Sequence, residues 1–169
     1  MIHVRTPHLF VALGLLVAGV GCSSASGGAE SGDDGGGGGG GGAISCDTAS
    51  ASEVVSALGF TGLQDPTSNS LGTVSECMYA ASSGSVLIRY ETQMTMADFE
   101  TGEQGFAMNG VAAGPVTGVG DAAYSSSLGS GSEAINTLVV LRNTTEVEIS
   151  APATLADLEA LAAQIITKF

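Results

Sequence analysis

The sequence predicts an α+β fold, an antiparallel β-sheet of about four to six strands combined with helices. Residues 85–92 and 145–150 alternate apolar and polar side chains with period two, as strands with one solvated face do. Residues 133–142 and 145–150 lie close enough in the chain to pair as an antiparallel hairpin. Helix starts at Ser50 and Thr154 precede apolar side chains at helical spacing. Together these patterns indicate a sheet with helices packed against it.

The first predicted helix begins with a capping box, Ser50-Ala51-Ser52-Glu53, and ends at Gly59 after two to three turns. Its short apolar stripe consists of Val54, Val55 and Leu58. Residues 60–72 contain Pro66 and several Ser, Thr and Asn residues, which indicates a loop that could include a short strand.

Two strands are predicted next, at 74–80 and 85–92, joined by a turn at 82–84. In the second strand Val86, Ile88 and Tyr90 share one face, and Leu87, Arg89 and Glu91 share the other. A second helix is expected from Thr95, with Asp98 as its capping partner, although Gly102 and Gly105 weaken it. A loop through Pro115 follows.

The C-terminal third holds the clearest elements. Residues 138–141 are apolar on both faces, which is typical of a central strand, whereas Glu146 to Ile149 alternates as a strand with one wet face does. The hairpin turn is expected near Asn143. The final helix, from Thr154, carries its apolar residues on one side: Leu155, Leu158, Leu161, Ala162, Ile165 and Phe169.

The N-terminus resembles a bacterial lipoprotein signal peptide. A positive residue, Arg5, precedes an apolar core from Leu9 to Val20, and small residues lead to Cys22. The segment is too short to span a bilayer as a helix. The resemblance is to the lipobox, although Gly19 stands where that motif prefers Leu. It implies that Cys22 receives a diacylglycerol, usually with acylation of its amine.

Three regions follow from this reading. Residues 1–21 are expected to be a signal peptide, 22–43 the lipidated cysteine with a flexible tether rich in Gly and Ser, and 44–169 a single globular α+β domain. The tether has a root-mean-square reach on the order of 25 Å. The expected location is the bacterial cell envelope, and the outer membrane in a Gram-negative host, because Ser23 rather than Asp follows the cysteine.

Charge and composition narrow the function. Loss of the signal peptide removes Arg5 and leaves three cations against all seventeen acids, so nucleic acid is an unsuitable partner. Both histidines, His3 and His8, lie in the signal peptide. A Ser-His-Asp triad, a Cys-His pair, a His-ligated metal and a His general base are therefore excluded from the remaining chain. No catalytic, cofactor-binding or metal-binding residues are assigned.

The cysteines form one expected pair. With Cys22 committed to lipid, Cys46 and Cys77 remain in an exported, oxidising compartment, which predicts a disulfide between them. Their wide spacing is unlike a redox C-x-x-C motif.

The segment Gly118-Val119-Gly120-Asp121-Ala122-Ala123 matches a dinucleotide fingerprint on paper. However, Pro115 precedes it and strand-compatible residues follow it, so a structural turn is the preferred interpretation and no cofactor is expected.

Together with Cys46, Cys77 and the C-terminal helix, this segment resembles small lipoproteins of an actinobacterial-type domain family of unknown function. The resemblance implies a PsbP-like architecture, with helices packed on one face of an antiparallel sheet, and supplies no catalytic residues.

Two functions remain open. The first is a non-catalytic envelope module, held at the membrane by lipid, that binds a protein, a glycan or a small ligand. The alternative is an enzyme that uses carboxylates alone, such as a glycan hydrolase. Alternation places Glu146 and Glu148 on the face away from the helices, with Arg89 and Arg142 as their expected partners, unless the two arginines converge to bind an anion.

Overall fold

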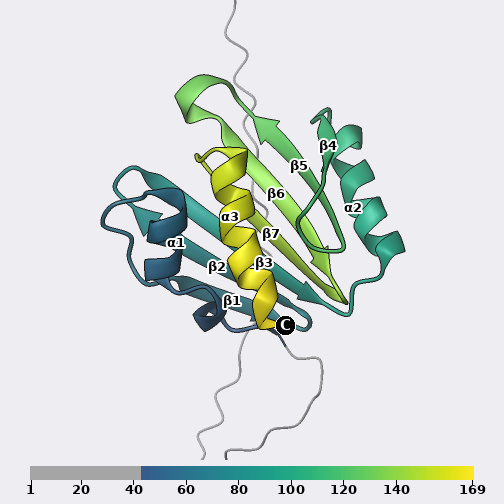
Figure 1. The fold of residues 1–169 in the computed structure, drawn as a ribbon, viewed down its shortest axis with the longest axis horizontal. Coiled ribbons are helices and arrows are strands. Elements are labelled where there is room, and N and C mark those ends of the chain that lie inside the picture. Colours follow the sequence, from purple (N-terminus) through teal and green to yellow (C-terminus); the bar gives the residue numbers. More distant parts are fainter. Residues whose placement is uncertain (1–42) are drawn as a thin grey trace, which may run out of the picture. The chain divides into compact units, whose positions relative to one another are not determined.

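The computed structural model describes residues 43–169. Their centre is a seven-stranded antiparallel sheet with the strand order β1-β2-β3-β7-β6-β5-β4 (Figure 1). The strands are β1 (Thr67–Leu71), β2 (Val74–Ala81), β3 (Gly84–Thr92), β4 (Ala113–Val116), β5 (Ala122–Leu128), β6 (Ile135–Arg142) and β7 (Thr145–Ala151). The helices are α1 (Ala51–Leu58), α2 (Met96–Met108) and α3 (Leu155–Ile165), with short 3₁₀ turns η1 (Cys46–Thr48), η2 (Gly131–Glu133) and η3 (Ile166–Lys168).

Capping side chains set where the helices begin. Ser50, Thr95 and Thr154 each accept a hydrogen bond from the backbone N–H three residues on, and a carboxylate at that position returns a bond to the cap. The reciprocal bonds satisfy N–H groups that the first helical turn leaves without partners. Helix α1 ends where Gly59 adopts a φ of 71°. The starts expected at Ser50, Thr95 and Thr154 are therefore confirmed.

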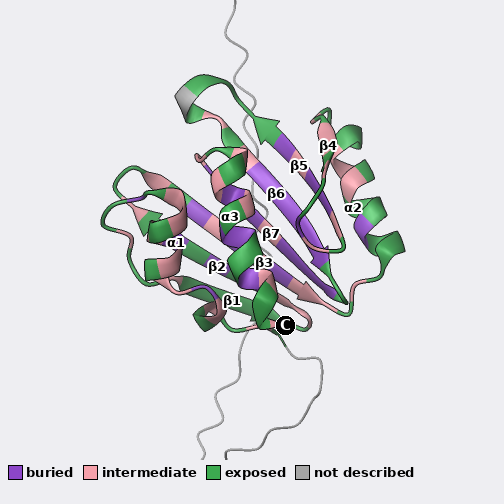
Figure 2. Cartoon of the chain, in the orientation of Figure 1, coloured by how far each residue is buried: buried purple, intermediate pink, exposed green. Residues whose placement is uncertain are grey.

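Alternation along the strands divides the sheet into two faces. We call the face that carries Tyr79, Ile88 and Val147 the first face, and the opposite face the second. Helices α1 and α3 lie across the first face, where the main core forms beneath them (Figures 1 and 2). Glu146 and Glu148 lie on the second face, so the predicted segregation of these residues is confirmed.

Helix α2 packs against the second face, not the first. Its Phe99 and Phe106 form a separate cluster with Tyr124 of β5 and with Val139 and Leu141 of β6. The Phe99 and Phe106 rings lie 5.0 and 5.6 Å from the Tyr124 ring, measured between centroids. The expectation that helices cover one face holds for α1 and α3 and is wrong for α2. The reason is that β6 is apolar on both sides, so each side requires a cover.

The sheet also has more strands than the four to six expected. Strand β1 forms within the region interpreted mainly as a loop, and β4 forms across Gly114 and Pro115. Both are edge strands, where proline and polar side chains are tolerated because only one side of the strand is paired. Because both edge strands have weak apolar patterning, the sequence predicts fewer strands than the sheet contains.

Candidate functional site

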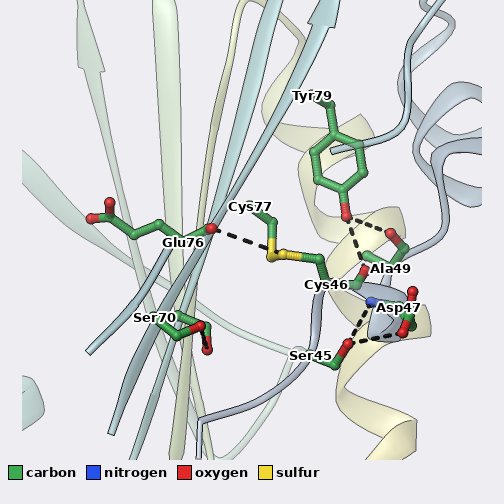
Figure 3. Close-up of a disulfide and its surroundings, with 9 residues drawn as sticks. Ser45, Cys46, Asp47, Ala49, Ser70, Glu76, Cys77 and Tyr79 are labelled. Carbon is green, nitrogen blue, oxygen red and sulfur yellow. Dashed lines mark hydrogen bonds between the residues drawn. A yellow bond between two sulfur atoms is a disulfide. The ribbon is translucent and has the colours of Figure 1, made fainter. Parts of the chain in front are cut away.

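The disulfide fastens the start of the domain to the sheet. Cys46 of η1 is bonded to Cys77 of β2 with their Cα atoms 5.6 Å apart, which confirms the predicted pair (Figure 3). The Tyr79 hydroxyl donates to the Ala49 carbonyl and, at 3.3 Å, to the Cys46 carbonyl. Burial raises the pKa of Tyr79 to about 12, so this donor keeps its proton.

A second fastening comes from the C-terminus. Lys168 Nζ donates to the Thr48 carbonyl at 2.6 Å and to Glu53 at 2.7 Å. Lys168 and the Ser50 cap together lower the pKa of Glu53 to about 2. The segment that enters the domain is therefore held by a covalent bond, by a tyrosine of β2 and by the chain's penultimate residue.

A polar hollow of about 820 Å³ lies beside this fastening. One wall is the entering segment, including Ser45 and Asp47, and the other follows β1, including Ser68 and Ser70. In Figure 3, Ser45 and Ser70 lie on either side of the space beneath the disulfide. The lining residues are Ala43, Ile44, Ser45, Cys46, Asp47, Ala49, Ser50, Ala51, Asp65, Pro66, Ser68 and Ser70. The volume lies within the range typical of ligand sites.

The second face is uncovered at the β1 side of the sheet. Here Asn69, Leu71, Glu76 and Met78 are exposed, and Leu71 is 83 % exposed. We call these four residues, together with Arg89 of β3, the open face. All five residues of β1 are exposed, as the colouring of that strand in Figure 2 shows.

A carboxylate cluster borders the open face. Cross-strand register places Glu148 opposite Arg89, and Glu146 opposite Glu91. Arg89 Nη1 lies 3.3 Å from Glu146 Oε1, and Arg89 also pairs with Glu91. The expected pairing of Arg89 with these glutamates is confirmed.

Arg142 does not join that cluster. Its guanidinium pairs with Asp121 at 2.8 Å, so the expected pairing of Arg142 with Glu146 or Glu148 is wrong. The two arginines do not converge on one pocket either, because each is engaged by a different carboxylate on a different part of the sheet.

Glu146 is 6 % exposed because its other neighbour, Leu141 of β6, belongs to the cluster beneath α2. Burial raises the pKa of Glu146 to about 7, with Glu91 and Glu148 adding to the rise and Arg89 opposing it. Burial also raises the pKa of Glu148. A carboxyl with this pKa can hold or release a proton near neutral pH, which is what a general acid or base requires.

The positions of Glu146 and Glu148 can be compared with the pair of carboxylates in a glycan hydrolase. Glu146 and Glu148 lie two residues apart on one strand, so both side chains project from the same face of the sheet, as a pair of catalytic carboxylates must. The hollow on the second face, of about 310 Å³, is lined by Asn69, Leu71, Val74, Glu76 and Arg89, and neither Glu146 nor Glu148 lines it. Among residues 43–169 no three Asp, Glu, Cys or His side chains are grouped to hold a metal ion.

The glycine-rich segment 118–123 has a structural role. It leads into strand β5, whereas a dinucleotide fingerprint needs a helix at that point. Asp121 accepts hydrogen bonds from Arg142 at 2.8 Å and from the Asn143 backbone at 2.6 Å. Asn143 adopts a φ of 55° in the turn between β6 and β7. Because Asp121 binds both Arg142 and Asn143, the segment supports this hairpin turn.

Cys22 lies outside the described residues, and its lipidation stays a prediction. Within the described part, no helix has the length and apolar character needed to cross a membrane.

The features that sequence reasoning missed are the free edge of β1 and the burial of Glu146. The first lies in a polar run without strand-like alternation, and the second depends on α2 covering the neighbouring strand. The apolar residues on both sides of β6 were the available signal for a second helical cover. Comparisons with protein-family models, curated proteins and solved structures give no match.

Proposed function

We propose that this protein is a lipid-anchored lipoprotein of the bacterial cell envelope whose domain is a non-catalytic binding module. The lipobox resemblance at Cys22 and the glycine-rich tether support the anchor. In a Gram-negative host the proposal places it at the outer membrane. Its contacts are the membrane through lipid, and an envelope protein, glycan or small ligand through the domain.

The observation that carries the binding role is the bare β1 side of the sheet. Two helices cover the first face and one covers the β4 side of the second face, yet the open face leaves Leu71 and Met78 exposed. The edge of β1 beside them is free of described partners, and on its first-face side it borders the hollow of about 820 Å³. An uncovered strand edge with apolar side chains nearby is a common surface for recognition.

Site-specific photo-crosslinking in intact envelopes tests the role. A crosslinking amino acid at Leu71 or Met78 should give defined adducts, whereas the same group at Met108, which is 87 % exposed on α2, should not. Equal adducts from all three positions, or none from any, would remove the support for the open face as a binding surface.

The alternative is a carboxylate-dependent enzyme, and the raised pKa of Glu146 favours it. Burial of Glu146 beside Leu141, with the charges of Glu91 and Glu148 nearby, gives this raised pKa a structural origin without a substrate. Hydrolysis of envelope glycan by the purified protein, lost in Glu146→Gln, would establish the enzyme. Crosslinking that is unchanged in Glu146→Gln, without hydrolysis, supports the binding module.

A further inference from the structure

The outer edge of β1 offers unpaired backbone groups. A tight turn at Gly72 and Thr73 closes the hairpin between Leu71 and Val74. In an antiparallel ladder, hydrogen-bonded and non-bonded pairs alternate, so Leu71, Asn69 and Thr67 bond to β2. The N–H and C=O groups of Ser68 and Ser70 consequently point away from the sheet, and no described residue pairs with them.

This edge lacks the usual protection against strand pairing. Edge strands are commonly blocked by proline, by lysine, by a bulge or by a covering segment. The opposite edge follows that practice, because β4 has four residues and contains Pro115. Thr67–Leu71 has no proline and no charged residue, and it pairs with β2 in unbroken register.

The adjoining hollow provides room for side chains of an added strand. Ser68 and Ser70 line it from β1, and the entering segment at Ser45 to Asp47 lines it from across the gap (Figure 3). A strand laid against β1 on this edge would direct alternate side chains toward the first face, into the space between these walls.

The carboxylates that line the hollow favour a partner with positive charge. Asp47 and Asp65 both line the hollow, and neither forms an ion pair with a described residue. Arg89, the cation of the open face, is already engaged by Glu91 and Glu146. A second copy of the chain would set these aspartates and a strongly negative net charge against their own kind, which is repulsive.

We infer that β1 takes up an extended, cationic segment of a partner protein as an additional antiparallel or parallel strand, with its Lys or Arg side chains beside Asp47 and Asp65. Main-chain hydrogen bonds to Ser68 and Ser70 supply affinity, and the two aspartates supply selectivity. This inference rests on the proposed binding role and gives it a mode and a partner chemistry.

Binding of two synthetic peptides to the full-length protein tests the inference. The first probe is Thr-Lys-Val-Lys-Val-Lys-Thr, and the matched probe carries Glu in place of Lys. We expect the Lys peptide to bind at least about tenfold more tightly at low salt, and we expect that preference to fall in Asp47→Asn/Asp65→Asn.

Backbone variants separate strand addition from a general attraction of charges. Ser70→Pro removes one outward N–H, and we expect about a tenfold loss of Lys-peptide affinity. Ser70→Ala keeps that N–H and should bind as the wild type does. Ser68→Pro is the second backbone variant. Proline is tolerated on edge strands, and thermal unfolding of each variant shows whether the fold is kept.

Several outcomes would overturn the inference. One is equal binding of both peptides, and another is affinity unchanged in both folded proline variants. A third is a dimer of the protein that Ser70→Pro dissociates, since that would assign the edge to a second copy. Crosslinks from Leu71 and Met78 in envelopes without peptide binding would leave the proposed binding module standing and reject strand addition alone.

Discussion

Gly120 shows how one residue can satisfy a sequence fingerprint for a structural reason. It has a φ of +65°, and a Cβ built there would lie 2.4 Å from Val140 Cγ1 and 2.6 Å from the Leu141 carbonyl oxygen. The close approach to β6 therefore excludes any side chain. Gly118, two residues earlier, also has a positive φ, of +90°, but a Cβ built there would have nothing within 4 Å.

These two glycines give a matched prediction. Gly120→Ala should lower the free energy of unfolding by about 3 kcal/mol or more, because the clash adds to the backbone strain. Gly118→Ala should cost about 1 to 2 kcal/mol, from the strain alone. Denaturant unfolding of both variants measures the difference, and equal losses would contradict the close approach.

Glu146 makes stability depend on pH. Its folded pKa of about 7 lies above the ordinary 4.5, so between these values the folded state holds more proton than the unfolded state. The free energy of unfolding should consequently fall as pH rises from 4.5 to 7, by on the order of 3 kcal/mol, and the decrease should level off above that.

Glu146→Gln should remove most of this slope and stabilise the protein at pH 8. Some slope should persist, because the pKa of Glu148 is raised as well. Glu100→Gln, on an exposed position of α2, is the control and should keep the wild-type slope. Unfolding midpoints measured across this pH range test the prediction. The same pH dependence in Glu146→Gln and the wild type would show that Glu146 ionises normally.

At the scale of elements, the disulfide determines how firmly η1 and α1 are attached to the sheet. The bond closes a loop of 31 residues, for which a loss of about 2 to 5 kcal/mol is expected on removal. Cys46→Ala/Cys77→Ala and the reduced wild type should show similar losses in thermal unfolding. A reduced protein as stable as the oxidised one would mean that Tyr79 and Lys168 hold the segment without covalent help.

Helix α2 depends on a small cluster, since Phe99 is its one buried residue. Phe99→Ala should cost about 3 kcal/mol or more and speed amide exchange throughout Met96–Met108. Phe106→Ala removes a half-buried ring and should cost less. Unchanged exchange in α2 for Phe99→Ala would show that its capping box and tertiary contacts elsewhere hold it.

The elements also show which parts of the fold are readable from sequence. Strands β3 and β7 alternate clearly, and α1, α2 and α3 begin at side chains that cap them, so local patterns were enough to place them. Strand β1 is polar except for the exposed Leu71, so it shows no apolar alternation, and the hairpin turn at Gly72 brings it beside β2. The sequence of β6 shows that both of its sides are apolar, but which helix covers the second side depends on tertiary packing and not on local pattern.

For the molecule as a whole, opposing ionisations set an optimum pH. Glu53, with a pKa lowered to about 2, contributes stability above its ordinary 4.5 that is lost as pH falls toward 2. Glu146 and Glu148 act in the opposite sense as pH rises above 4.5. The melting temperature should therefore be highest near pH 4 to 5. At pH 7, added salt should raise it by screening the net negative charge, and a maximum above pH 7 would contradict this balance.

Amide exchange measured in intact envelopes and again after purification tests directly whether a partner covers the edge of β1. The amides of Ser68 and Ser70 should exchange quickly in the purified protein and slowly in envelopes, where a partner strand covers β1, while exchange in α2 stays the same. Equal exchange of β1 in both settings would contradict the claim that this edge is where the protein binds.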